Sequence, residues 1–135
     1  MVLNIGVTGE KEMIVTEKDL ASFAGNIGVE VLSTHCVVLL IELAARQAIE
    51  GHLPEGQITL GTRVAVRHLS AAPIGSKVRA VARLTAVEGR KLYFHVAAYD
   101  EVDKLAEGEN EQIVVSRDFL LGKIKQKASK NQSEL

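Results

Sequence analysis

The sequence is poor in the residues that several kinds of site require. Among its 135 residues it has one cysteine, Cys36, no tryptophan and only 4% aromatic residues. A single cysteine excludes an intrachain disulfide and any cysteine-rich metal site. The scarcity of aromatic side chains and a formal net charge of -1 argue against nucleic-acid binding, because that binding depends on a basic surface and on stacking platforms.

Long hydrophobic runs are also missing. No apolar stretch approaches the roughly 18 residues that a membrane span requires. The first residues, MVLNIGVTGEKE, lack the basic start and apolar core of a secretory signal. With 47% hydrophobic and 24% charged residues, the composition is that of a folded domain and not of a disordered chain. These features predict one small cytoplasmic domain that binds neither membranes nor nucleic acid.

The longest apolar segment, CVVLLIELAA at 36–45, predicts a helix. Ser33 and Thr34 precede it as N-cap candidates, and Gly51 and Pro54 follow it as stop signals. Its first turns are apolar on every side, which is typical of a helix surrounded by protein. We therefore expect one long helix from Thr34 to about Gly51.

Segments in which polar and apolar residues alternate lie on both sides of this helix. A short strand at 11–16 and a short helix at 17–24 are expected before it. Four strands are expected after it, at 57–70, 77–87, 91–100 and 111–119. Their short connections indicate an antiparallel sheet, so the fold class is α+β, with about five strands and one long helix on one face. Such a sheet cannot cover an apolar helix fully, so we expect a second subunit.

The C-terminal end of the chain differs from the rest in composition. Residues 123–135 read KIKQKASKNQSEL and are rich in lysine and poor in apolar side chains. We expect 1–122 to form a single domain and 123–135 to be a polar tail, either disordered or a frayed helix end. A basic arm that binds nucleic acid is the alternative for this segment.

Glu42 is the most unusual residue of the predicted helix. It is the only charged residue between Cys36 and Ala45. A carboxylate in such a place must be paired, hydrogen-bonded, protonated or directed into a pocket. The structural alternative is that Glu42 lies on a narrow solvent-exposed stripe or bonds a basic residue of the sheet.

His68 lies in the predicted strand 57–70. Alternation places it on one face with Leu60, Val64 and Val66, so its ring should point towards the helix. The structural alternative is a core histidine whose ring nitrogens are satisfied by the backbone.

Thr34 and Gly61 are weaker candidates when each is taken alone. Thr34 is either an ordinary N-cap or part of a site that uses the free N–H groups and positive end of the helix to stabilise an oxyanion. Gly61 interrupts a strand, which marks either a bulge or a close approach of ligand to the backbone. Cys36 is interpreted as a small buried hydrophobe. No spacing among the histidines and carboxylates suggests a metal site, and no cofactor is expected.

Three segments carry these candidates: VLSTHCVVLLIELAA, GQITLGTRVAVRHLSAAPIGSKVRAVARL and GRKLYFHVAAYD. The most specific feature is an ordered set of residues. It comprises Thr34, Glu42, Gly61, His68, Pro73 and Gly75. From about residue 31 to residue 119 the chain resembles the fluoroacetyl-CoA-thioesterase-like branch of the hotdog-fold thioesterases.

The resemblance implies a homodimeric hotdog domain that hydrolyses a small or medium acyl-CoA thioester. It implies that Thr34, Glu42 and His68 are the catalytic residues and that Gly61 supplies a backbone group at the site. Gln112 departs from the pattern, because relatives tend to have arginine there, and this leaves the substrate open. Specificity for fluoroacetyl groups is not expected.

A thioesterase needs an activated nucleophile and donors for the developing oxyanion. Glu42 is assigned as nucleophile or as base for water, and His68 as proton shuttle. The Thr34 hydroxyl orients the reacting groups, and the Gly61 N–H helps to hold the carbonyl oxygen. Thr34 and Glu42 lie about 12 Å apart along one helix, so we expect a site between subunits. The main alternative is a non-catalytic acyl-CoA-binding or regulatory dimer; a hotdog hydratase acting on enoyl thioesters is the weaker one.

Overall fold

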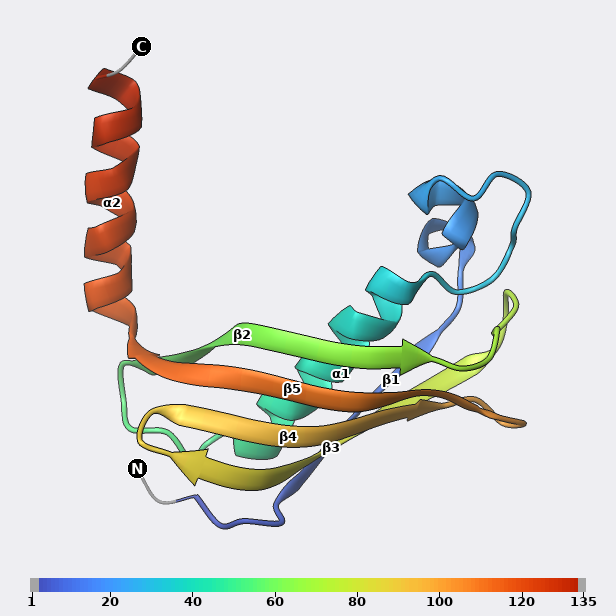
Figure 1. Ribbon diagram of the computed structural model, residues 1–135, viewed down its shortest axis with the longest axis horizontal. Coiled ribbons are helices and arrows are strands. Elements are labelled where there is room, and N and C mark those ends of the chain that lie inside the picture. Colours follow the sequence, from blue (N-terminus) through green and yellow to red (C-terminus); the bar gives the residue numbers. More distant parts are fainter. Residues whose placement is uncertain (1–2, 134–135) are drawn as a thin grey trace.

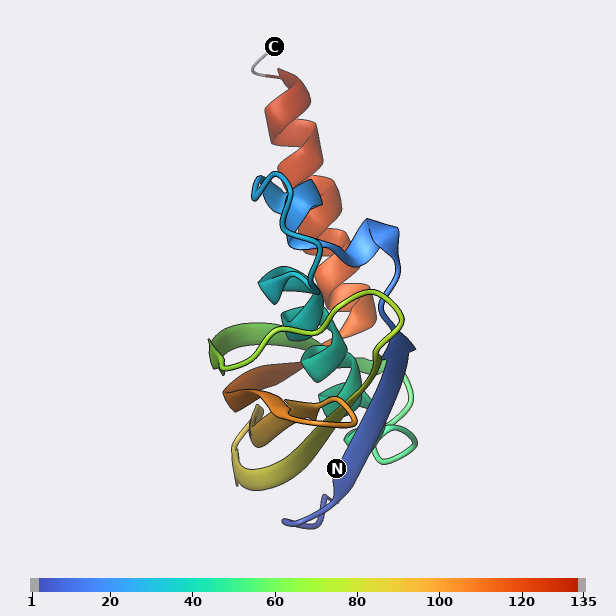
Figure 2. The same ribbon diagram turned by 90° about the vertical axis from the view of Figure 1, so that its right-hand side faces the viewer.

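The computed structural model describes residues 3–133, except for the side chains of residues 23, 24, 132 and 133. A single five-stranded sheet curls around one long helix (Figures 1 and 2). The strands are β1 (Thr8–Ile14), β2 (Gln57–His68), β3 (Lys77–Glu88), β4 (Lys91–Tyr99) and β5 (Lys104–Ser116). The helices are α1 (Thr34–Ile49) and α2 (Arg117–Ser133), with the 3-10 turns η1 (Glu17–Asp19) and η2 (Ala21–Ala24).

The sheet order is β1-β3-β4-β5-β2, and every neighbouring pair is antiparallel. The predicted α+β hotdog architecture is thereby confirmed. The order places β1 and β2 at the two free edges of the sheet, so the strand that follows α1 directly is an edge strand. An edge strand has unpaired backbone groups along one side, which suits it for pairing with another chain.

Helix α1 lies in the hollow of the sheet and provides much of the core. Its inner side is apolar and buried through Val37, Leu40, Ile41, Ala44, Ala45, Ala48 and Ile49. The small side chains let β1 approach closely: a Cβ on Gly9 would collide with backbone atoms of Ala44 and Ala48. The outer side of the helix is not covered, since Leu39 remains 56% exposed.

The segment before α1 differs from its prediction. The strand β1 begins earlier and ends earlier than the expected 11–16, and the expected helix 17–24 is a pair of short 3-10 turns. The turns follow from the capping of Asp19, whose carboxylate accepts hydrogen bonds from the amide and hydroxyl of Thr16. These local bonds stabilise single turns better than a continued helix.

The C-terminal part differs more. The last strand begins at Lys104 and not at residue 111, and it ends at Ser116. Residues 117–133 form α2, so the disorder expected for the tail from Lys123 does not apply up to Ser133. Residues 134 and 135 lie outside the described part of the chain. The segment is rich in good helix formers and has no proline. Figure 1 shows α2 projecting away from the sheet.

Candidate active site

The start of α1 meets the end of β2 through a pair of polar side chains. Thr34 Oγ1 lies 2.9 Å from His68 Nδ1, and the two atoms share a hydrogen bond. The helix cap itself is Ser33, so Thr34 is the first helical residue and not the N-cap. The Thr34 hydroxyl therefore bonds the imidazole across the fold, as the functional interpretation of Thr34 requires.

His68 points towards α1, as the strand alternation predicts. Its second ring nitrogen, Nε2, is buried and has no hydrogen-bond partner within residues 3–133. The alternative of a core histidine satisfied by the backbone is thus wrong for both nitrogens. An imidazole held at one nitrogen and unpaired at the other has the arrangement of a proton-transfer group.

The middle of α1 meets β2 at a second point. Both carboxylate oxygens of Glu42 lie 3.3 Å from the position that a Cβ on Gly61 would occupy. The Glu42 side chain is 24% exposed, and its charged neighbour is Arg46, 3.9 Å away on the same helix. This long ion pair is at the limit of a salt bridge and contributes little. The alternatives for Glu42, a surface stripe or a bond to a basic residue of the sheet, do not describe this position.

A bulge in β2 explains why Gly61 and His68 face the same side of the sheet. The two residues are seven positions apart, an odd spacing that would send them to opposite faces of a regular strand. The pairing with β5 shifts between Gly61 and Arg63, so that Thr62 is an extra residue. The bulge also corrects the face predicted for Leu60: it pairs with Ile113 and lies opposite to the helix-facing side.

The structure adds two buried polar residues that the sequence analysis did not assign to the site. Asn110 is 1% exposed and Gln112 is fully buried, and both lie on β5. Gln112 is the direct cross-strand partner of Gly61, and Asn110 is that of Val64. The alternation of glutamate with Asn110, Gln112 and Val114 is a strand pattern that could have indicated them. It was missed because the strand was expected to start only at residue 111.

The two pairs, Thr34–His68 and Glu42–Gly61, lie at separate points along α1. Thr34 and Glu42 are eight residues apart in one continuous helix, which corresponds to about 12 Å. One chain therefore has the candidate residues in two half-sites on the same side of the sheet.

The outer face of the sheet has a different character. It carries exposed ion pairs such as Arg63–Glu109 and Arg79–Glu10. The pKa of Glu107 is lowered because Lys104 donates a hydrogen bond to it, and the same contact raises the pKa of Lys104. These groups lie on the solvent side of the sheet, away from α1, and are interpreted as a solvated face.

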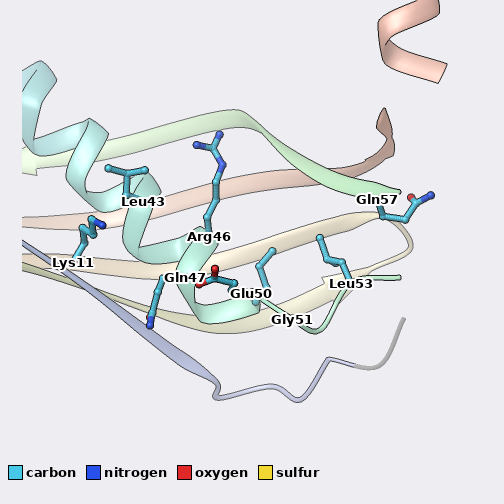
Figure 3. A pocket seen from close by; sticks show the side chains of 9 residues that line it. Lys11, Leu43, Arg46, Gln47, Glu50, Gly51, Leu53 and Gln57 are labelled. Carbon is cyan, nitrogen blue, oxygen red and sulfur yellow. The ribbon is translucent and has the colours of Figure 1, made fainter. Parts of the chain in front are cut away.

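Two surface hollows flank the outer side of α1. The larger has a volume of about 420 Å³ and lies at the end of the helix, where Lys11, Arg46, Gln47 and Gln57 border it (Figure 3). The second, of about 320 Å³, runs between β1 and α1 and is lined by Met13, Ile14, Cys36, Leu39 and Leu43, among others. Neither hollow is lined by a candidate catalytic residue, so neither is the active site of the single chain.

Other kinds of site were examined over the same residues. Within 3–133, no three or more His, Cys, Asp or Glu side chains are grouped as metal ligands would be. Among the described helices, none combines the length and the apolar character that crossing a membrane demands.

Comparison with known proteins places this arrangement in a family. The profile of the fluoroacetyl-CoA-specific thioesterases (FlK) matches residues 15–118. The fluoroacetyl-CoA thioesterase of Streptantibioticus cattleyicolor is 38% identical over 98 residues, which cover 73% of this chain and 70% of that protein.

Solved structures agree with the sequence comparison. The structure of FlK superposes with a TM-score of 0.86 at 29% identity, covering 94% of this chain and 98% of that one. A Thermus thermophilus thioesterase superfamily member gives a TM-score of 0.90 at 30% identity, covering 96% of both chains. A FlK variant has also been solved in complex with acetyl-CoA, with a TM-score of 0.86 at 30% identity over 93% of this chain and 98% of that one. The chain therefore belongs to the fluoroacetyl-CoA-specific thioesterase family of hotdog-fold proteins.

Proposed function

We propose that this protein hydrolyses acyl-CoA thioesters with a small or medium acyl group, using Glu42, Thr34, His68 and Gly61. Family membership supports thioester hydrolysis, and the acetyl-CoA complex of the FlK variant supports a CoA thioester as substrate. The single observation that carries the assignment is the half-buried Glu42 carboxylate held against the backbone of Gly61, where no Cβ intervenes.

The reaction adds water across the C–S bond. Glu42 either removes a proton from water, which then attacks the thioester carbonyl carbon, or attacks that carbon itself and forms an acyl-enzyme that water hydrolyses. The carbonyl oxygen becomes negative and needs a donor, which the backbone of Gly61 supplies. The C–S bond breaks, and His68 delivers a proton to the departing CoA sulfur. The products are the free acid and CoA.

A homodimer joined through β2 would complete this site. The two half-sites of one chain are about 12 Å apart, whereas a thioester carbonyl needs all its catalytic groups within a few ångströms. An edge-to-edge antiparallel pair, with a two-fold axis close to Val64 and Ala65, sets Gly61 of one copy near His68 of the partner subunit. The uncovered outer side of α1, with Leu39 exposed, supports burial against a second copy.

A reducing, cytoplasmic location fits this proposal. Cys36 is a free thiol, and free thiols persist in the cytoplasm, where disulfides are rare.

Thiol release tests the activity directly. The purified protein is incubated with acetyl-, butyryl-, hexanoyl- and decanoyl-CoA and a thiol-detecting dye. We expect saturable release of CoA, fastest with the shorter chains. Binding of these thioesters without release of CoA would instead support a non-catalytic acyl-CoA-binding dimer.

Mixing of inactive variants tests whether the site is shared. Glu42→Gln and His68→Ala subunits are each expected to be inactive. After unfolding and refolding together in equal amounts, they should recover about a quarter of wild-type turnover if each site takes Glu42 from one copy and His68 from the other. If both residues act within one chain, the mixture stays as inactive as its components.

A further inference from the structure

Asn110 and Gln112 form a short hydrogen-bonded chain on the helix-facing side of β5. The amide nitrogen of Asn110 donates to the carbonyl oxygens of Arg63, at 3.0 Å, and of Glu111, at 3.4 Å. Two backbone acceptors therefore fix the orientation of the Asn110 amide, and its oxygen faces Gln112. The Gln112 amide nitrogen donates to that oxygen at 2.8 Å.

This chain leaves one acceptor without a partner. Because the nitrogen of Gln112 must face Asn110, its oxygen Oε1 points the other way. Oε1 is buried and accepts no hydrogen bond from any residue within 3–133, and the whole Gln112 residue is 0% exposed. A buried carbonyl oxygen without a donor costs stability, so such groups call for an explanation beyond packing.

Gln112 lies beside the proposed reaction centre. In the sheet it stands between Leu92 on β4 and Gly61 on β2. Directly opposed residues of an antiparallel pair have their side chains on the same face, about 5 Å apart. Glu42 occupies the space above Gly61 on that face. The carbon next to a thioester carbonyl held at Gly61 is therefore within reach of the Gln112 amide.

We propose that Gln112 is a specificity-determining residue whose Oε1 accepts a hydrogen bond from an O–H group on C2 of the acyl chain, so that the enzyme prefers 2-hydroxyacyl-CoA. This inference rests on the proposed thioesterase function. An alkyl group at the same place leaves the acceptor unpaired. A C–F group brings a second electronegative atom against the amide oxygen.

The test compares substrates of nearly equal size. Hydroxyacetyl-CoA and propionyl-CoA differ by OH in place of CH3. Wild-type kcat/KM is expected to be at least about tenfold higher for hydroxyacetyl-CoA, and fluoroacetyl-CoA should fall below both, since a site built for a hydroxyl rejects analogues without it. Gln112→Met keeps the length of the side chain and removes the acceptor, so the ratio should fall towards one. Gln57→Met, the same change outside the site, should leave the ratio unaltered.

Several results would overturn this assignment. A wild-type ratio near one, with all thioesters hydrolysed, contradicts it and leaves the thioesterase function standing. An unchanged ratio in Gln112→Met contradicts it too. If that variant does not fold, Gln112→Asn takes its place, because it withdraws the amide by one methylene and must lower the ratio.

Failure of the thioesterase function itself is recognised separately. In that case no thioester is hydrolysed, and the dissociation constants of hydroxyacetyl-CoA and propionyl-CoA for the unmodified protein are compared by calorimetry. At least about tenfold tighter binding of hydroxyacetyl-CoA supports the role of Gln112, and equal binding overturns it.

Discussion

The carboxylate of Glu42 rests directly on the backbone of Gly61, with both oxygens 3.3 Å from the place of the missing Cβ. This contact joins the one charged residue in the apolar part of α1 to the one bulge in β2. It depends on glycine at position 61 because any larger residue puts a carbon atom where the carboxylate lies.

Replacement of Gly61 by Ala should therefore affect turnover more than stability. The added Cβ pushes the flexible end of Glu42 by a few tenths of an ångström, and the backbone at 61 has no positive φ that alanine would strain. We expect the free energy of unfolding to change by less than about 1 kcal/mol, and kcat/KM to fall by about 10- to 100-fold. Thermal melting and thiol release measure the two effects. Unchanged kcat/KM would mean that the contact has no catalytic role.

The hydrogen bond between Thr34 and His68 should matter through its hydroxyl. Thr34→Val keeps the shape of the side chain and removes the bond, so the imidazole loses its fixed orientation. We expect kcat to fall by about 10- to 100-fold, with a loss of about 1 kcal/mol in stability. Thr34→Ser keeps the hydroxyl and is the control, expected to retain most of the activity. Equal losses in both variants would point to packing of the methyl group and not to the hydrogen bond.

Gly9 tests the close approach of β1 to α1. A Cβ there would collide with the backbone oxygen of Ala44 and the backbone nitrogen of Ala48, neither of which can move alone. Gly9→Ala should lower the free energy of unfolding by about 2–3 kcal/mol, seen as a fall in Tm of roughly 10 °C. Gly122→Ala is the matched control, since no atom lies within 4 Å of its added Cβ. A Tm for Gly9→Ala equal to that of the control would contradict the packing of β1 on α1.

The C-terminal helix α2 is expected to be dispensable for the fold and the reaction. Its described side chains from residue 121 to residue 131 are exposed, and the sheet ends at Ser116. Truncation before Lys123 should keep the Tm within a few degrees and kcat/KM within about twofold, since exposed termini tolerate removal. A larger rise in KM that disappears at high salt would assign the lysines of α2 to binding the CoA phosphates.

Much of the fold could be predicted because the local patterns are strong. The apolar run at 36–45 and the alternation in β3 and β4 gave an α+β sheet with a central helix. The start of β5 was not predictable in the same way, because alternating glutamates at 107, 109 and 111 resemble a solvated turn. Their outward direction follows only from pairing with β2 and β4.

The candidate site was predicted residue by residue, but its geometry was not. Strict alternation places Gly61 and His68 on opposite faces of β2. Only the extra residue at the bulge brings both to the helix, and no property of Thr62 in the sequence announces it. The buried amides of Asn110 and Gln112 were likewise hidden, since burial of a polar side chain is a tertiary property.

The central claim, that Glu42 carries out the chemistry, is tested most directly by thiol release from the Glu42→Gln variant on the best acyl-CoA substrate. Glutamine keeps the shape of the side chain against Gly61 and cannot act as a base or a nucleophile. Turnover should fall by at least about 1,000-fold, while the Tm stays level or rises, because a partly desolvated charge has been removed from an apolar helix. A folded Glu42→Gln variant that hydrolyses the substrate at a near-normal rate would contradict the account.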